Sequence, residues 1–312
     1  MFNVKSLNGT TLLADQRIER HIYAAAMLPC FTAREVAEER GRRMEEAKQA
    51  GGRAVRAVKG KIAVIGVHGP IEQHVSSALM KAGGTSCDEI SAALDACMAT
   101  SDVAAIVLHV DSPGGSSYGV EELSDKIFAA RQKKPIYAIA DSLSASAAYW
   151  LATSAETLWC TPGGDVGSVG VFSIYIDESK AIEAMGLAVT LIRAGEYKAE
   201  GIGLGPLSKD AIAHRQNSVD ETYGKFTDSL ARNRSVSKSV VRSDFGKGRM
   251  FGAEQALAAK MIDRIGSFET MMTQLTGSGT SSKAAAMDMK RKQNEQRKRE
   301  AEWLKIKPKG TA

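Results

Sequence analysis

The sequence has few cysteines, and their spacing excludes a disulfide-rich framework. Its four cysteines, Cys30, Cys87, Cys97 and Cys160, are widely separated and form no CxxC pair. Cys87 and Cys97 fall in one predicted helix, where ten residues span about 15 Å, which is too far for a disulfide. We therefore expect buried free thiols in a protein of a reducing compartment.

Long apolar runs are also missing. No stretch approaches the roughly 20 apolar residues that a membrane-spanning helix needs. The first twenty residues lack the charged-then-apolar pattern of a secretory signal. We expect a soluble cytoplasmic protein with no membrane contact.

Excess charge is confined to the C-terminal end. The 312 residues carry a net charge of +5, but residues 283–312 alone hold ten basic and four acidic side chains, so the rest of the chain has a net charge of −1. This near-neutral body argues against a nucleic-acid-binding protein, and any such contact would fall to the basic tail.

Composition divides the chain into three parts. Residues 1–56 are polar and include a helix-forming segment at 33–50, which predicts an N-terminal helical arm. Residues 57–275 contain the apolar segments of a folded domain. Residues 276–312 begin with a Gly/Ser-rich linker and continue as the basic tail, which is either disordered or folds on a partner.

Apolar runs in the central part alternate with helical patterns. Strands are predicted at residues 61–69, 104–110, 135–140, 157–160, 170–176 and 188–193. Helices are predicted at residues 85–100, 120–132, 145–153, 178–185 and 208–233. Short, nearly continuous apolar strands alternating with helices indicate an α/β fold with a mostly parallel sheet covered on both faces.

A glycine pair follows the second predicted strand, in the run Asp111-Ser112-Pro113-Gly114-Gly115. Ligands of open α/β sheets bind beyond the carboxyl ends of the strands. Backbone N–H groups of Gly114 and Gly115 are therefore candidates for an oxyanion hole. A plain tight turn is the alternative interpretation.

A serine surrounded by small residues follows the third predicted strand. In the run SLSASAAYW, Ser146 lies near the junction of a strand and a helix, where a substrate carbonyl meets little steric obstruction and the helix N-terminus favours negative charge. The alternative is a helix packed closely on the sheet, with Ser142 or Ser144 as its N-cap.

A serine nucleophile needs a base, and the sequence has few histidines to supply one. The five are His21, His68, His74, His109 and His214. None lies in residues 140–200, and those in predicted strands are more often satisfied core or edge side chains than catalytic groups. A lysine can replace histidine where burial keeps its amine neutral. Lys198, just past the predicted strand at 188–193, is the candidate; an ordinary solvated lysine is the alternative.

The order of these motifs is more specific than any one of them. SPGG, SASAAYW, GSVGV and YK, spaced along residues 61–266, together resemble the signal peptide peptidase A family of Ser–Lys peptidases. The resemblance implies a ClpP/crotonase-like fold of repeated ββα units and no cofactor or metal. It places the nucleophile at Ser146, the general base at Lys198 and the residue that orients the base at Ser168. The oxyanion hole would use amides of Gly114 or Gly115 and Ala147.

The sequence departs from the family at Ala147-Ala148, where bacterial members usually have Gly-Gly. An oxyanion amide tolerates this change if φ is negative there. The charged N-terminal arm and basic tail look more like the phage branch, the minor capsid protein C type of head maturation protease. That branch implies a polypeptide substrate (scaffold, coat or portal protein), a homo-oligomeric ring that completes the active sites, and a location in the host cytoplasm or prohead interior.

Two other functions fit the same sequence. A crotonase-type acyl-CoA enzyme shares the backbone oxyanion hole and uses carboxylates, for which Glu196 and Glu200 lie in the right region. A catalytically silent capsid assembly or scaffold component would use only the arm and the tail.

Overall fold

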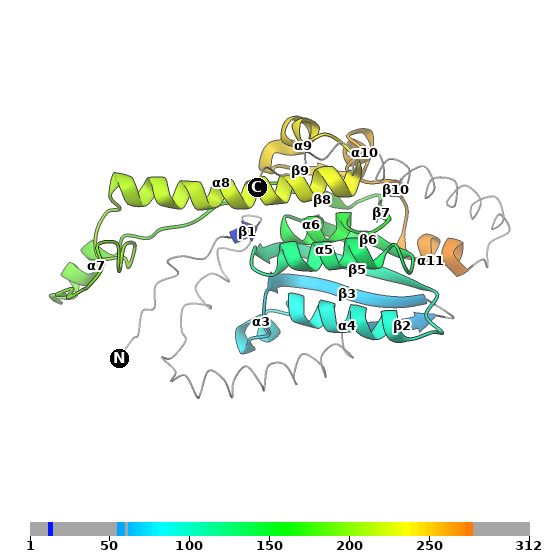
Figure 1. The fold of residues 1–312 in the computed structure, drawn as a ribbon, viewed down its shortest axis with the longest axis horizontal. Coiled ribbons are helices and arrows are strands. Elements are labelled where there is room, and N and C mark those ends of the chain that lie inside the picture. The colour runs from blue at the N-terminus through cyan, green and yellow to red at the C-terminus, as the bar shows by residue number, and fades with distance from the viewer. Residues whose placement is uncertain (1–11, 15–54, 60–61, 277–312) are drawn as a thin grey trace, which may run out of the picture.

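A mostly parallel β-sheet forms the centre of the computed structural model, which describes residues 12–14, 55–59 and 62–276 (Figure 1). The main strands lie in the order β10-β7-β6-β5-β3-β2; all neighbours run parallel except β2, which is antiparallel to β3. The strands are β1 (Leu12–Ala14), β2 (Val55–Lys59), β3 (Ile62–Glu72), β4 (Thr85–Ser86), β5 (Ala105–Ser116), β6 (Ile136–Ala145), β7 (Thr157–Cys160), β8 (Asp165–Gly167), β9 (Met250–Gly252) and β10 (Arg264–Ile265). The α/β class and its parallel sheet are confirmed.

Helices connect and cover these strands. They are α3 (Ser77–Lys81), α4 (Cys87–Ala99), α5 (Val120–Ala130), α6 (Ala147–Thr153), α7 (Ser179–Ala184), α8 (Lys209–Arg234), α9 (Lys238–Asp244), the 3₁₀ helix η2 (Gly246–Gly248), α10 (Ala253–Ala258) and α11 (Phe268–Thr276). Ser86 caps α4 in a capping box with Glu89. No helix in the described ranges is long and apolar enough to cross a membrane.

The two faces of the sheet bury alternate residues of each strand. Ala63, Ile65 and Val67 of β3 join the larger cluster, which includes residues of α4, α5, α6 and α8. Ile62 and Val64 face the other way and pack with Met271 and Met272 of α11. Both faces are therefore covered, as the apolar strands predict.

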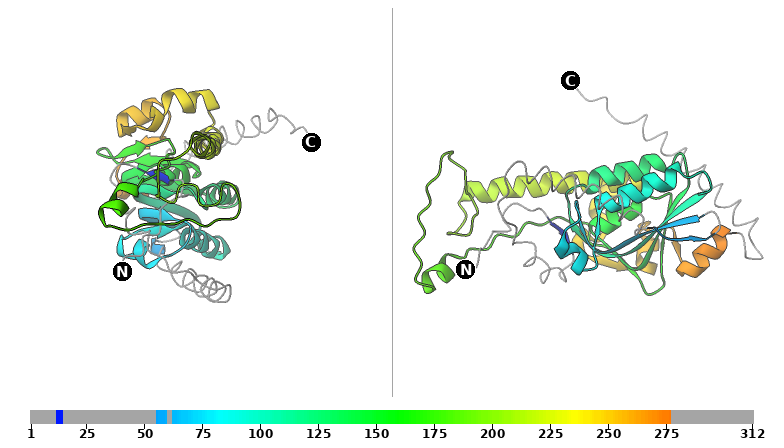
Figure 2. Two further views of the ribbon diagram at one scale, coloured as in Figure 1. Left: turned by 90° about the vertical axis from the view of Figure 1, so that its left-hand side faces the viewer. Right: turned by 90° about the horizontal axis from the view of Figure 1, so that it is seen from below.

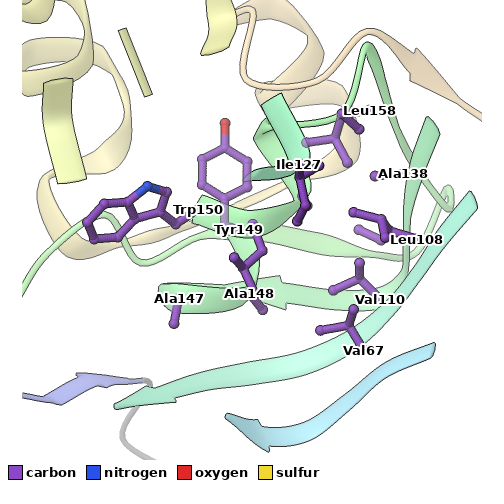
Figure 3. Packing of buried hydrophobic residues seen from close by; sticks show 14 of the residues in the cluster. Val67, Leu108, Val110, Ile127, Ala138, Ala147, Ala148, Tyr149, Trp150 and Leu158 are labelled. Atoms are coloured by element: carbon purple, nitrogen blue, oxygen red, sulfur yellow. The ribbon is translucent and has the colours of Figure 1, made fainter. Parts of the chain in front are cut away.

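Helix α6 lies inside the larger cluster, and all of its residues are buried. Figure 3 shows Ala147, Ala148, Tyr149 and Trp150 beside side chains of the central strands. The Trp150 ring stacks on Phe226 of α8 at 4.6 Å, and the Tyr149 hydroxyl donates to the Met261 carbonyl at 2.8 Å. These contacts fix the helix that begins directly after Ser146.

Predicted strands at residues 170–176 and 188–193 were wrong: the structure has no strand in either range. The segment containing them carries α7 and, with the first turns of α8, projects beyond the sheet (Figure 1, Figure 2). Backbone groups of an apolar segment form a strand only where a neighbouring strand accepts their hydrogen bonds. In this single chain the projecting segment does not lie along the sheet.

The thiol prediction is confirmed for the cysteines that the structure describes. Cys87, Cys97 and Cys160 are free and buried. Cys30, the helical segment at 33–50 and the basic tail lie outside the described residues. The division into arm, domain and tail therefore stays a prediction.

Candidate active site

Ser146 is the single residue between β6 and α6, and its backbone is strained. Its φ of 56° and ψ of −122° lie in a backbone region that non-glycine residues rarely adopt, at a typical cost of about 1–3 kcal/mol. The Ser146 amide donates to the Gly167 carbonyl at 2.8 Å, and its carbonyl accepts from the Trp150 amide at 2.9 Å. The sheet and α6 together hold the strained conformation.

The Ser146 hydroxyl is fully buried and finds no hydrogen-bond partner among the described residues. An unsatisfied buried hydroxyl costs roughly 1–3 kcal/mol. Ser144 shares this property, but its backbone belongs to the regular ladder, where it pairs with Ser112 and Val166. Among the serines that the structure describes, only Ser146 combines an unpartnered hydroxyl with a sharp strand-to-helix turn.

Gly114 lies directly against this turn. A Cβ placed on Gly114 would fall 2.7 Å from the Ala145 carbonyl oxygen, 2.8 Å from the Ser146 Cβ and 3.0 Å from the Ala147 nitrogen. Its φ of +90° also requires glycine. The absence of a side chain thus lets the backbone of β5 touch the proposed nucleophile.

The glycine pair lies within β5 and does not form the plain tight turn of the alternative interpretation; the strand, predicted to end at residue 110, runs further. β5 continues through Gly115 to Ser116, with a register shift between Val110 and Ser112. A Cβ on Gly115 would lie 2.0 Å from the Ile71 carbonyl oxygen of β3. Close strand pairing therefore accounts for the second glycine.

Two backbone amides of the proposed oxyanion hole meet here. Ala147 is the first residue of α6, so its N–H has no acceptor within the helix. The Gly114 amide donates to the Ser112 hydroxyl at 3.1 Å, and that hydroxyl donates to the Gly69 carbonyl at 2.6 Å. Sequence reasoning missed this role of Ser112, although the residue belongs to the SPGG motif.

Ala147 and Ala148 satisfy the condition set by the sequence. Both are buried residues of α6, and neither is among the described residues with positive φ. Alanine in place of glycine therefore leaves the Ala147 amide available at the start of the helix.

Ser168 is brought close to Ser146 through the backbone. Ser168 follows Gly167, whose carbonyl accepts a hydrogen bond from the Ser146 amide. The amide of Ser168 itself donates to the Arg249 carbonyl at 3.0 Å. Its φ is 54° and its side chain is buried. The structure thus joins Gly114, Ser146, Ala147 and Ser168 in one place.

Lys198 is not part of this group in the single chain. It is exposed in the projecting segment, where its amide donates to the Gly195 carbonyl at 3.1 Å. The predicted buried position of Lys198 was therefore wrong for this chain by itself. A hollow of about 640 Å³ between Tyr197, Glu200 and α8 lies in the same segment.

His109 of β5 contacts Asp141 and Phe268 and is not hydrogen-bonded to Ser146. His109 Nε2 lies 2.7 Å from Asp141 Oδ2, and its ring packs against Phe268 at 4.7 Å. The sequence did not predict this pair. Since the part of the chain that is described gives the Ser146 hydroxyl no partner, neither His109 nor His68 is hydrogen-bonded to it.

Comparison with known proteins assigns part of the chain to a family. Residues 129–279 match the model of the family described as Peptidase family S49. The chain contains a peptidase family S49 domain. The matched range includes Ser146, Ser168 and Lys198, whereas Gly114 and Gly115 precede it.

Relatives of this S49 domain include phage proteins. The chain is 29% identical over 227 residues to the head-tail preconnector protein GP5 of Enterobacteria phage P21, covering 72% of this chain and 45% of that protein. It is 28% identical over 204 residues to the capsid assembly protease C of Escherichia phage lambda, covering 65% and 46%. The chain thus matches about half the length of these relatives.

A solved structure is also similar. The ClpP1 N165D mutant from Listeria monocytogenes aligns with a TM-score of 0.41 and 14% identity, covering 66% of this chain and 92% of that one.

Proposed function

We propose that this protein is a serine endopeptidase in which Ser146 is the nucleophile. The observation that carries the proposal is the buried, unpartnered Ser146 hydroxyl on a strained strand-to-helix turn, pressed against Gly114. Strain of this kind persists where the surrounding structure enforces it, and it clusters at active sites. The S49 domain supports a peptidase over the acyl-CoA alternative, for which Glu196 and Glu200 were considered.

The proposed reaction is acyl transfer to Ser146. Lys198 takes the hydroxyl proton as Oγ attacks the substrate carbonyl, and it returns that proton to the leaving amine. Water then hydrolyses the acyl-enzyme with the same base. The Ala147 amide and one of the Gly114 and Gly115 amides stabilise the oxyanion. For Gly114 to stabilise the oxyanion, its amide must break its hydrogen bond to the Ser112 hydroxyl and donate to the substrate oxygen instead.

Lys198 would reach Ser146 from a neighbouring copy of the chain. Seven exposed large apolar side chains lie within residues 176–197. They are Ile176, Met185, Leu187, Val189, Leu191, Ile192 and Tyr197. A cluster of this kind marks an interaction surface. If that surface packs on another copy, it buries these side chains, brings Lys198 to a second Ser146 beside its Ser168 and desolvates the amine.

The natural substrate would be an extended segment of a phage scaffold, coat or portal protein. This part of the proposal is supported by the phage relatives, whose names refer to capsid assembly and to the head-tail preconnector. An extended peptide binds by adding a strand to an open sheet edge. The end of β5, beside Ser146, is the edge that fits, and it is open to such a peptide when β1 does not pair there.

Co-expression with candidate scaffold, coat and portal proteins, followed by mass spectrometry, tests the proposal. Ser146→Ala and Lys198→Ala should each abolish new cleavage, and Ser168→Ala should slow it. Ser144→Ala is the matched control, because Ser144 is also buried and unpartnered and lies two residues away. Full processing by the Ser146→Ala protein would refute the peptidase assignment and favour a silent assembly component.

A further inference from the structure

The N-terminal strand β1 lies where a substrate would bind. Leu12–Ala14 pairs antiparallel with the last residues of β5, in the register Leu12 with Ser116, Leu13 with Gly115 and Ala14 with Gly114. A stretch of 40 residues separates β1 from β2, so it joins the sheet from far along the sequence (Figure 1). No compositional signal in the polar N-terminal part marks it as a strand.

β1 pairs with the edge of β5 that lies beyond the end of the β5–β6 pairing. On one side, β5 pairs with β3 as far as Ile71 and Gly115. On the other side, it pairs with β6 only as far as Ser112 and Ser144, because β6 then turns into Ser146 and α6. Since Gly115 pairs with both Ile71 and Leu13, β1 must use the side that β6 has left.

Chain direction brings the end of β1 toward the nucleophile. From Leu12 to Ala14 the strand runs toward Gly114. Gly114 in turn lies against the Cβ of Ser146 and the amide of Ala147. Residues 12–14 therefore have the polarity of the acyl side of a bound peptide, and Ala14 is the β1 residue whose register position is nearest the proposed oxyanion hole.

We propose that the N-terminal segment is bound as an internal substrate and that Ser146 cleaves the peptide bond after Ala14. This inference rests on the proposed peptidase function. Ser146 Oγ bonds to the Ala14 carbonyl carbon as the bond to the next nitrogen breaks, and the hydroxyl proton goes to that nitrogen. Water then releases residues 1–14 with a free carboxylate and restores the serine hydroxyl. Until this happens, β1 competes with external peptides for the same edge of β5.

Intact-mass analysis of the purified full-length chain, over time, tests this proposal. We expect a Ser146-dependent loss of residues 1–14 and no loss from Ser146→Ala. Replacing Leu12 and Leu13 together by proline removes a backbone donor whichever of them is hydrogen-bonded, and should slow the loss at least about fivefold. The matched control replaces Ala24 and Ala25 by proline, outside β1, and should lose the segment at the unaltered rate.

Cleavage of casein by the same samples separates the two proposals. Loss of residues 1–14 together with casein cleavage supports both. Casein cleavage by a chain that keeps residues 1–14, or that is cut elsewhere, overturns the internal-substrate proposal and leaves the peptidase assignment standing. A homogeneous sample that cleaves neither casein nor itself, even with candidate capsid substrates present, overturns both.

Discussion

Replacing Gly114 by alanine adds one methyl group at the point where β5 touches the nucleophile. The new Cβ would lie 2.7, 2.8 and 3.0 Å from Ala145 O, Ser146 Cβ and Ala147 N, all of them closer than real Cβ atoms normally approach. The φ of +90° adds backbone strain. Left-handed backbone costs a non-glycine residue about 1–2 kcal/mol, and overpacking about 1–3 kcal/mol, so the free energy of unfolding should fall by roughly 2–5 kcal/mol.

Activity should fall further than stability. The added carbon is relieved only if Ser146 or the Ala147 amide moves, and displacement of a nucleophile or oxyanion donor typically costs about a hundredfold or more in turnover. Gly163→Ala is the matched control, since no atom lies within 4 Å of its added Cβ and its φ is not positive. It should change the free energy of unfolding by less than about 0.5 kcal/mol.

Guanidinium unfolding and casein turnover, measured on the two variants and the parent, check this prediction. At a slope of about 4 kcal/mol per molar, the midpoint of Gly114→Ala should fall by roughly 0.5–1.2 M. If Gly114→Ala matched Gly163→Ala in both midpoint and turnover, the close approach of β5 to Ser146 would be refuted.

Three further predictions concern Ser146 and other buried groups of the domain. Ser146→Gly and Ser146→Ala should both be inactive, but the glycine variant should be more stable by about 1 kcal/mol because its φ of 56° suits glycine; equal melting temperatures would contradict the strain. Asn233 donates to the Thr153 and Ser154 hydroxyls at 3.1 Å each, so Asn233→Leu should lower the free energy of unfolding by about 1–3 kcal/mol, as denaturant titration would show. Burial raises the pKa of the Cys87 and Cys160 thiols to about 12, so a disulfide reagent at pH 8 should modify them only on unfolding. Rapid labelling of the native protein would contradict this expectation. Because the folded state holds these thiol protons more tightly, the free energy of unfolding should also fall as pH rises from the unfolded pKa near 9 toward 12.

The central strands were predictable because their signal is local. Continuous apolar runs, such as those of β5 and β6, bury side chains on both faces and need no knowledge of their neighbours. The order of glycine and serine motifs also predicted that Gly114 and Ser146 belong to one site. The structure adds the contact between them, which depends on the register of β5 and β6.

Predictions failed where structure depends on a distant partner. β1 is a strand only because β5 leaves an edge unpaired at Gly114–Gly115. The residue types of Leu12–Ala14 do not indicate that such an edge exists. The apolar segment 188–193 has the composition of a strand but does not join the sheet. The position of Lys198 relative to Ser146 is of the same kind, because we propose that a second copy decides it.

The central claim is that Ser146 of one copy works with Lys198 of another, and co-expression of two inactive variants tests it directly. Differently tagged Ser146→Ala and Lys198→Ala chains would be purified together and assayed on casein. In a randomly mixed ring, roughly a quarter of the sites would combine an intact serine with an intact neighbouring lysine, so we predict about that fraction of the parent activity. Mixed oligomers with no activity, formed from variants that are each folded, would contradict the claim.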